Sequence, residues 1–207
     1  MKVAAVVPAY NEAANIARVL RVAVRSPVID EVVVVCDGCE DNTAAVARRY
    51  PVKVVELRQN VGKGGAMMAG VRETEAPVIL FLDADLVGLR YTHIRDLVEP
   101  VRRGDADMTV GVFDQGRLAT DLAQRLAPFL SGQRAVRRTV LEDIPELEQS
   151  RFGVEVALSR YAEKQRLRVV KVPLPGLAQV MKEEKAGLWR GFRARMRMYW
   201  EILKSVR

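Results

Sequence analysis

The run Pro-Val-Ile-Leu-Phe-Leu-Asp-Ala-Asp at residues 77–85 says most about the fold of this chain. A continuous apolar run of this length, opened by proline and closed by acidic residues, is typical of a strand buried on both faces of a parallel sheet. Open α/β sheets bind ligands at the carboxyl ends of such strands. Asp83 and Asp85, separated only by Ala84, can there hold a hard divalent cation and through it a diphosphate. A solvated acidic turn is the alternative interpretation of this pair when it is taken alone.

The first half of the chain alternates between short β-rich runs and helix-like segments. This alternation is typical of βαβ units around a mostly parallel sheet flanked by helices, and it predicts an α/β fold. The expected strands cover residues 2–7, 31–36, 52–57 and 78–82, and the expected helices cover residues 12–24, 41–50 and 62–74.

The second half is less regular and contains no internal repeat, low-complexity tract or linker. We therefore expect it to elaborate the same domain, so that residues 1–207 form one domain. The expected helices cover residues 92–103, 118–130 and 154–165 and begin again near 188, and the expected strands cover 107–112 and 168–172. Residues 131–150 are rich in charge and turn formers and are interpreted as a connecting segment.

The composition indicates which kinds of partner and which cellular compartment to expect. The net charge of +7 and the pI of about 9.7 favour anionic partners, which include phosphorylated substrates, acidic membrane surfaces and nucleic acid. No apolar stretch approaches the ~20 residues needed to span a bilayer. With only two cysteines and no apolar leader at the start, a cytoplasmic setting is expected, at most at the inner face of a membrane.

Each early strand ends in a polar cluster. The clusters are residues 8–12 (Pro-Ala-Tyr-Asn-Glu), 37–38 (Asp-Gly), 60–65 (Asn-Val-Gly-Lys-Gly-Gly) and 83–85 (Asp-Ala-Asp). In a parallel sheet they converge on one edge. An aromatic ring, a carboxylate able to contact a base, a lysine for phosphate and a pair of carboxylates for a metal together fit a nucleoside diphosphate.

These four motifs, in this order, resemble the motif set of family 2 glycosyltransferases with the GT-A fold, over roughly the first 115 residues. The resemblance implies a nucleoside diphosphate sugar as donor, a hydroxyl or phosphate acceptor, and Mg²⁺ or Mn²⁺ as cofactor. It implies that Pro8, Ala9, Tyr10, Glu12, Asp37, Asn60, Lys63, Asp83 and Ala84 bind the donor, with Asp37 reading the base edge and Lys63 meeting the diphosphate. Asp85, Lys63 and Glu155 are the expected catalytic residues, with Asp85 as a metal ligand. Glu155 lies on an apolar helix, so its side chain faces either the site or solvent.

Three later segments are similar to parts of the glucosyl-3-phosphoglycerate synthase group: residues 116–120, 130–134 and 152–156. In that group the first segment binds the phosphate and carboxylate of the acceptor, although here it has one extra residue before the threonine. The similarity implies an anionic small-molecule or lipid-phosphate acceptor. The expected acceptor-binding residues are Gly116, Arg117, Thr120, Gly132 and Gln133. The chain would then divide into a donor half (1–115), an acceptor half (116–185) and a terminal helix (186–207).

One position departs from the GT-A pattern. Many enzymes with this fold supply a C-terminal histidine as a further metal ligand, whereas the corresponding stretch here, residues 175–180, offers Gln179. Its carbonyl oxygen can ligate a cation, but more weakly than imidazole binds manganese. The single histidine, His93, follows the fourth strand.

The motifs allow other interpretations. A Walker phosphate loop is excluded, because Leu57 stands where its first glycine should be and Gly64 stands where a hydroxyl is needed. Cys36 and Cys39 have redox spacing but no second pair that would complete a zinc site. A nucleotidyltransferase, which usually has its glycine-rich loop after the first strand, and a non-catalytic protein that binds a membrane or a partner remain as alternatives.

The segment Leu188–Arg207 has apolar residues at three- and four-residue spacing and basic residues largely outside that stripe. This pattern predicts an amphipathic helix that docks on an anionic membrane surface, on the body of the protein or on a second subunit in a homodimer. Nucleic acid is not an expected partner.

Overall fold

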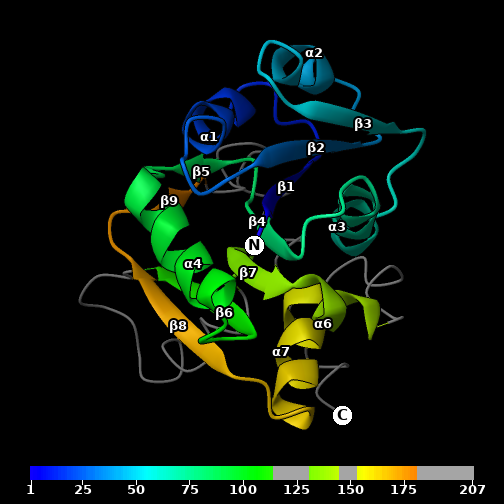
Figure 1. Ribbon diagram of the computed structural model, residues 1–207. Coiled ribbons are helices and arrows are strands. Elements are labelled where there is room, and N and C mark those ends of the chain that lie inside the picture. Colours follow the sequence, from blue (N-terminus) through cyan, green and yellow to red (C-terminus); the bar gives the residue numbers. More distant parts are fainter. Residues whose placement is uncertain (114–130, 145–152, 181–207) are drawn as a thin grey trace, which may run out of the picture.

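The computed structural model describes residues 1–113, 131–144 and 153–180. These residues form three layers, a seven-stranded sheet with helices on both faces (Figure 1). The strands follow the order β3 (Lys53–Leu57), β2 (Glu31–Asp37), β1 (Val3–Ala9), β4 (Val78–Phe81), β7 (Arg134–Arg137), β6 (Met108–Phe113) and β8 (Val169–Leu174). Within this sheet β7 alone runs antiparallel to its neighbours. The predicted mostly parallel α/β fold is confirmed.

The central strands are apolar on both faces because helices cover both faces. In β1, Val3, Ala5 and Val7 belong to the core on one side of the sheet, while Ala4 and Val6 belong to the core on the other. The residues Val78–Phe81 of β4 are at most 1% exposed. Full burial of a large aliphatic side chain contributes roughly 1.5–3 kcal/mol, so these strands anchor the fold.

One face of the sheet carries α1 (Ile16–Ala23), α2 (Thr43–Ala47) and α4 (Tyr91–Arg103) (Figure 1). The apolar stripe expected on the first helix is the buried face of α1, formed by Ile16, Val19, Leu20 and Ala23. The α-helix begins at Ile16, four residues later than the pattern predicted, because Glu12–Asn15 form a turn closed by the bond from the Asn15 N–H to the Glu12 carbonyl.

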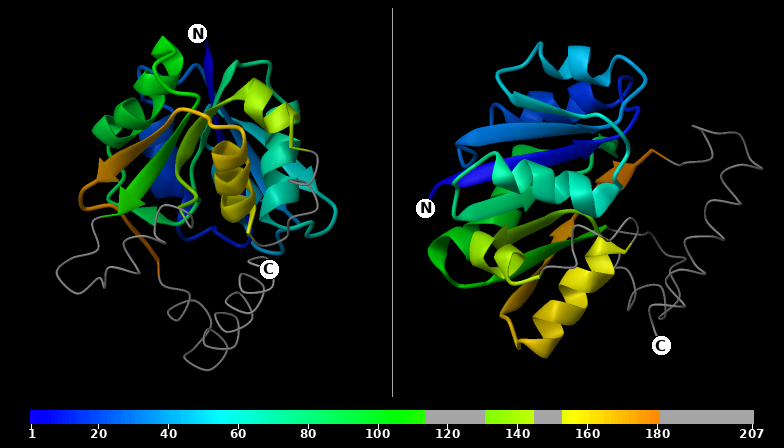
Figure 2. Two further views of the ribbon diagram at one scale, coloured as in Figure 1. Left: turned by 90° about the horizontal axis from the view of Figure 1, so that it is seen from below. Right: turned by 90° about the vertical axis from the view of Figure 1, so that its right-hand side faces the viewer.

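The opposite face carries α3 (Lys63–Arg72), α6 (Arg138–Glu142) and α7 (Val154–Lys164), as both views in Figure 2 show. Helix α3 lies very close to the sheet. A Cβ on Gly70 would stand 2.4 Å from Val6 Cγ1, so only glycine allows this approach. The approach fixes the start of α3, and therefore Lys63, relative to β1.

The interpretation of residues 131–150 as a connecting segment is wrong for residues 134–142, which form β7 and α6. A four-residue strand bounded by two arginines has too little apolar periodicity to be recognised, and Arg134, at 1% exposed, is buried where the sequence suggests a solvated charge. Two further strands, β5 (Leu86–Val87) and β9 (Ala178–Gln179), pair antiparallel in a small second sheet. Strands of two residues leave no pattern in a sequence.

Several predictions fall on residues that the structure does not describe. These are the helix over 118–130, the helix from 188, and the acceptor residues Gly116, Arg117 and Thr120. Across the described ranges, every helix is too short or too polar to cross a bilayer.

Candidate active site

The site lies where the four parallel strands β3, β2, β1 and β4 end. Because β7 is antiparallel to β4, with Phe81 opposite Arg134, the residues just before β7 reach the same edge. Gly132 and Gln133 therefore lie beside Asp83, which comes two residues after β4. Thus two expected acceptor residues and the acidic motif come together from positions 50 residues apart in the chain.

Asp83 is the centre of the site. Its side chain is 12% exposed, and its two oxygens receive three donors. Lys63 Nζ lies 2.6 Å from Oδ1, Gln133 Nε2 donates to Oδ2 over 2.8 Å, and the Gln179 amide nitrogen also donates to Oδ2. Burial alone raises the pKa of Asp83, but the Lys63 charge and the three hydrogen bonds outweigh it and hold this pKa below its usual value. Asp83 is therefore ionised at neutral pH, and both of its oxygens accept hydrogen bonds.

Lys63 bridges two carboxylates. It is the first residue of α3, and its Nζ lies 2.6 Å from Asp83 Oδ1 and 2.6 Å from Glu155 Oε1. Burial lowers the pKa of Lys63, but the charges of Asp83 and Glu155 raise it well above its usual value, so the ammonium stays charged. Glu155, in the first turn of α7, thus faces the site and not solvent, which decides between the two orientations that the sequence left open.

Gly132 makes this arrangement possible. A Cβ at this position would stand 2.5 Å from Lys63 Nζ, 2.6 Å from Asp83 Oδ2 and 2.7 Å from Asp83 Oδ1. A side chain here would displace the ends of Lys63 and Asp83, so the backbone of the loop before β7 packs directly against the ion pair.

Arg134, to which the sequence pattern assigns no role, supports the loop before β7 and the start of α7. Its Nε donates to the Ser131 carbonyl over 2.8 Å and one terminal nitrogen donates to Ser159 Oγ over 3.0 Å. Ser159 Oγ donates in turn to the Glu155 carbonyl over 2.8 Å. Burial lowers the pKa of Arg134 to about 10, opposed by the charge of Glu155, so the guanidinium stays cationic at neutral pH. The signal in the sequence was an arginine directly after a site glutamine.

Asp37 holds the glycine-rich loop. Its Oδ1 accepts the Val61 N–H over 2.7 Å and its Oδ2 accepts the Gly62 N–H over 3.0 Å, while Asn60 Nδ2 donates to the Asp37 carbonyl over 3.2 Å. Asp37, which the resemblance assigns to the base edge, thus also holds the loop that precedes α3. A carboxylate has about four acceptor positions, so two N–H bonds leave capacity for a base.

The motif after β1 lies over the start of α2. The Glu12 N–H donates to Thr43 Oγ1 over 2.8 Å and the Ala13 N–H donates to Asp41 Oδ2 over 3.1 Å. Pro8 and Ala9 end β1, and residue Tyr10 is 48% exposed. An exposed ring at the edge of the sheet is available for stacking against a planar ligand.

The residues expected to bind metal lie close to one another. Asp85 is half-buried, its carbonyl accepts the Val180 N–H over 3.3 Å, and Gln179 pairs with Leu86 in the small sheet. Within residues 1–113, 131–144 and 153–180, no three His, Cys, Asp or Glu side chains form a group that could hold a metal ion. One carboxylate, Asp85, together with the Gln179 amide oxygen fits a cation such as Mg²⁺, which proteins usually hold with one or two carboxylates together with substrate phosphates.

His93 lies in α4 and is 2% exposed. Burial and the charge of Arg90 lower its pKa, so the ring is neutral at pH 7. Gln179, and not this histidine, occupies the position next to Asp83.

The cysteine pair gives no support to a redox or metal site. Burial, followed by the proximity of Cys39, raises the pKa of Cys36 to about 12. Cys39 Sγ donates to the Ala9 carbonyl over 3.3 Å. A thiol with a raised pKa is a poor nucleophile and a poor metal ligand, because both functions need the thiolate.

Solved structures with the same architecture contain a nucleotide and a metal. The chain superposes on glucosyl-3-phosphoglycerate synthase from Mycobacterium tuberculosis in complex with Mn²⁺, uridine diphosphate and glucosyl-3-phosphoglycerate. The TM-score is 0.71 at 26% identity, over 86% of this chain and 72% of that one. The complex of the same protein with Mg²⁺ and uridine diphosphate gives a TM-score of 0.70 at 26% identity, over 86% and 71% of the two chains.

Curated relatives include longer proteins. The glycosyltransferase AglD of Haloferax volcanii is 33% identical over 122 residues, which are 54% of this chain and 19% of that protein. The dolichol-phosphate mannosyltransferase of Pyrococcus furiosus is 26% identical over 201 residues, which are 84% of this chain and 56% of that protein. The chain thus spans less than two thirds of the length of these relatives.

A family model described as glycosyl transferase family 2 matches residues 4–171. This match covers the whole sheet up to β8 and every described site residue except Gln179. The protein belongs to glycosyl transferase family 2.

Proposed function

We propose that this protein transfers a sugar from a nucleoside diphosphate sugar to a hydroxyl or phosphate of an anionic acceptor, with help from Mg²⁺ or Mn²⁺. The observation that carries this proposal is the cluster in which Lys63 bridges Asp83 and Glu155 next to Asp85, at the carboxyl edge of the sheet. The cluster combines a cation for a leaving diphosphate with carboxylates for a metal.

The donor would lie across the ends of β1, β2 and β4. The exposed Tyr10 ring, with Pro8, Ala9 and Glu12, would hold the base and ribose, and Asp37 would contact the base with the acceptor positions that its loop bonds leave. The start of α3 would face the diphosphate, and a helix amino terminus favours anions. The sugar would then lie near Asp83, Gly132 and Gln133.

The chemical step would depend on neutralising the departing diphosphate. A divalent cation, when bound, supplies Lewis-acid stabilisation of the phosphate oxygens. Asp85 would hold it, with the Gln179 amide oxygen as a second donor and Asp83 close by. Lys63 would exchange its bond to Asp83 or Glu155 for one to the diphosphate, so that its charge stabilises the leaving group as the bond to the sugar breaks.

Similarity to two groups of proteins supports an acceptor that carries phosphate. Solved synthase structures include complexes with phosphoglyceric acid and with glucosyl-3-phosphoglycerate, and a curated relative is named for dolichol phosphate. Gly132 and Gln133 lie beside Asp83. We propose that they contact the acceptor and that Arg117, with Gly116 and Thr120, binds the anion of the acceptor.

The position of the glycine-rich loop argues against a nucleotidyltransferase. In that class the loop usually follows the first strand, whereas Gly62–Gly65 here follow β3 and open α3. We further propose that the protein works in the cytoplasm, where residues 188–207 bring it to an anionic membrane surface or join two copies.

Turnover of sugar nucleotides tests this function. The purified protein would be given uridine diphosphate glucose and other nucleoside diphosphate sugars with Mn²⁺, each with phosphoglyceric acid or a polyprenyl phosphate as acceptor. Release of nucleoside diphosphate together with a glycosylated acceptor is the expected result. The proposed function is wrong if no donor stabilises the protein against heating and no combination gives product.

A further inference from the structure

Arg134 is a buried cation between two elements that carry site residues. It is the first residue of β7, is 1% exposed, and lies between the loop before β7 and helix α7. Val136 points to the same face of the sheet and packs in an apolar core with Met108. An apolar side chain at position 134 would therefore suit the fold, whereas a buried charge is costly unless it is paired and hydrogen-bonded. The cation at this position needs a reason beyond packing.

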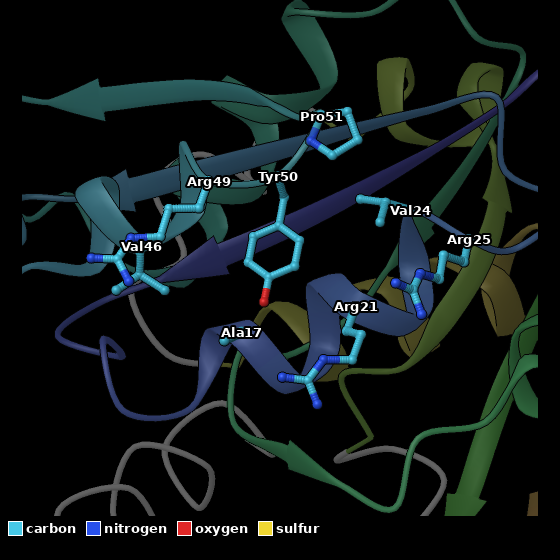
Figure 3. Close-up of a pocket in the computed structure, with 8 residues that line it drawn as sticks. All are labelled: Ala17, Arg21, Val24, Arg25, Val46, Arg49, Tyr50 and Pro51. Carbon is cyan, nitrogen blue, oxygen red and sulfur yellow. The ribbon is translucent and has the colours of Figure 1, made fainter.

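Other arginines of the chain are solvated. Arg21, Arg25 and Arg49 are exposed and line a cavity of about 580 Å³ between α1 and α2. Their guanidinium groups lie on different sides of the Tyr50 ring, so they do not converge on a common partner (Figure 3). An exposed guanidinium keeps its hydration and costs the fold little. Arg134, in contrast, depends on the protein for its hydrogen bonds.

The Nε of Arg134 holds the loop that precedes β7. It donates to the Ser131 carbonyl over 2.8 Å. Ser131 Oγ accepts the Gln133 N–H over 3.4 Å and donates to Gln133 Oε1 over 3.3 Å. The amide of Gln133 donates to Asp83 Oδ2 over 2.8 Å. This first arm of contacts therefore runs from the guanidinium to the carboxylate of Asp83.

A terminal nitrogen of Arg134 holds the start of α7. It donates to Ser159 Oγ over 3.0 Å, and Ser159 Oγ donates to the Glu155 carbonyl, one helical turn earlier, over 2.8 Å. Burial lowers the pKa of Arg134, and the charge of Glu155 opposes this lowering, so the two charges attract each other. Glu155 Oε1 lies 2.6 Å from Lys63 Nζ. This second arm therefore runs from the guanidinium to the other carboxylate that binds Lys63.

A guanidinium can serve both arms because it is a rigid, planar fork. Its Nε and its terminal nitrogens donate in different fixed directions, whereas an ammonium is a single point of charge. Here the fork bonds Ser131 and Ser159, and the arms end on Asp83 and Glu155, each 2.6 Å from Lys63 Nζ. The separation of these two carboxylates thus depends on one side chain behind them.

We propose that Arg134 is a positioning residue for sugar transfer. It acts through Ser131 and Ser159, and it keeps Asp83 and Glu155 in place when Lys63 exchanges one of them for the leaving diphosphate. The proposal depends on the function proposed above, so one of its tests uses no substrate.

A charge-conserving substitution tests the fork. Arg134→Lys keeps a cation but cannot bond Ser131 and Ser159 together, so kcat should fall by about tenfold or more. The KM for the donor should change by less than about threefold, because Tyr10 and Asp37 would still bind the base. Steady-state kinetics measure both constants. An unchanged kcat in Arg134→Lys would overturn the proposal.

Arg138→Lys is the matched control. The Nε of Arg138 donates to the Ala76 carbonyl and a terminal nitrogen donates to the Val71 carbonyl, each over 3.0 Å, beyond the end of α3 that carries Lys63. This variant should lose stability and keep its kcat, because the fork of Arg138 serves only the far end of α3. A parallel loss of kcat in the two lysine variants would mean that Arg134 only stabilises the fold, and would overturn the proposal.

Chemical rescue separates the guanidinium group from general packing. Met108 and Ser159, which contact the guanidinium, also line a groove of about 290 Å³ between α7 and the strands β6 and β8. Arg134→Ala would leave a space behind this groove that a small cation can enter. Guanidinium chloride, far below the concentrations that unfold the protein, should restore part of the lost kcat, whereas urea and sodium chloride should not. No restoration by guanidinium, or equal restoration by urea, would overturn the proposal. The lysine variants decide the matter if Arg134→Ala does not fold.

An unfolding measurement tests the positioning without a substrate. Lys63→Met, Glu155→Gln and the double variant give the coupling between Lys63 and Glu155. In the Arg134→Lys background this coupling should fall by about half or more, and in the Arg138→Lys background it should not change. The same coupling in both backgrounds would overturn the proposal. If the coupling falls as expected but no donor is turned over, the positioning holds and the proposed function is what fails.

Discussion

The backbone of Gly132 lies directly against the carboxylate of Asp83, so close that a Cβ on residue 132 would stand 2.6 Å from Oδ2. Because Lys63 Nζ would be equally close, at 2.5 Å, such an atom would push apart the ion pair at the centre of the site. Gly132 does not have a positive φ, so the constraint here is space and not backbone conformation.

We expect Gly132→Ala to lower sugar transfer by about tenfold or more, because Lys63 and Asp83 must both shift. Overpacking of this kind typically costs about 1–3 kcal/mol, which the fold should survive. Steady-state kinetics and thermal melting on the same sample measure the two effects.

Gly104→Ala is the matched control. Gly104 ends α4 with φ at 87°, and a Cβ there would meet only Arg137, at 3.5 Å. This change should cost about 1 kcal/mol of stability through backbone strain and leave activity intact. If both alanine variants lose activity in proportion to their stability, the steric account of Gly132 is wrong.

Lys63 should contribute to stability as well as to turnover. Lys63→Met leaves Asp83 and Glu155 without their shared cation, and breaking a buried pair by removing one partner is strongly destabilising. Because the lysine side chain is 31% exposed, we expect a loss of about 2 kcal/mol in urea unfolding, below the full cost for a buried pair.

A double variant tests the cause of that loss. Adding Asp83→Asn to Lys63→Met removes the stranded carboxylate, so the double variant should be more stable than Lys63→Met alone. Simple additivity of the two single losses would contradict an ion pair as the source of the effect.

The sequence predicted those site residues that lie at the ends of the parallel strands or in the loops that follow them. Pro8, Asp37, Lys63 and Asp83 lie where the pattern of alternating strands and helices placed them, because parallel strands bring their carboxyl ends to one edge. Local periodicity was enough for this part of the fold.

Residues that reach the site through long-range pairing could not be placed in this way. Gln133 arrives through β7, an antiparallel strand of four residues, and Gln179 arrives through a strand of two residues. Neither strand has measurable periodicity, and register between distant segments is set by tertiary packing. For the same reason the burial of Arg134 beneath the site was not foreseen, since a charge in a polar segment is usually solvated.

Asp107 offers a test of pH-dependent stability away from the site. Its carboxylate receives the Arg168 backbone N–H over 3.0 Å and the Arg168 guanidinium over 2.8 and 3.1 Å, which joins the starts of β6 and β8. The hydrogen bonds from Arg168 lower the pKa of Asp107 from 3.8 to about 2, against a smaller opposing effect of burial. A depressed pKa stabilises the fold above the unfolded value, and this stabilisation is lost as the pH falls through the folded value.

We therefore expect Asp107→Asn to lower the free energy of unfolding by about 1 kcal/mol at neutral pH, because solvent screens part of the interaction with the half-exposed Arg168. The difference from the unmodified protein should shrink below about pH 4 and vanish near pH 2. Urea unfolding followed across this range measures the difference. A gap that stays constant from pH 7 to pH 2 would show that the carboxylate charge is not its source.

Asp85→Ala tests the metal assignment without disturbing the ion pair. Asp85 is half-buried, whereas the donors to Asp83 come from Lys63, Gln133 and Gln179. In the proposed arrangement the diphosphate supplies part of the coordination, so metal and donor should bind with mutual dependence. In the unmodified protein, Mn²⁺ should raise the thermal stabilisation given by uridine diphosphate glucose. In Asp85→Ala this increment should disappear and turnover should fall by at least about a hundredfold, since metal charge at the leaving group is worth several kcal/mol.

Asp96→Ala is the control. It changes an exposed aspartate on α4 and should keep both the Mn²⁺ effect and the turnover. If Mn²⁺ still increases the thermal stabilisation of Asp85→Ala by uridine diphosphate glucose, other residues bind the metal and this assignment is wrong.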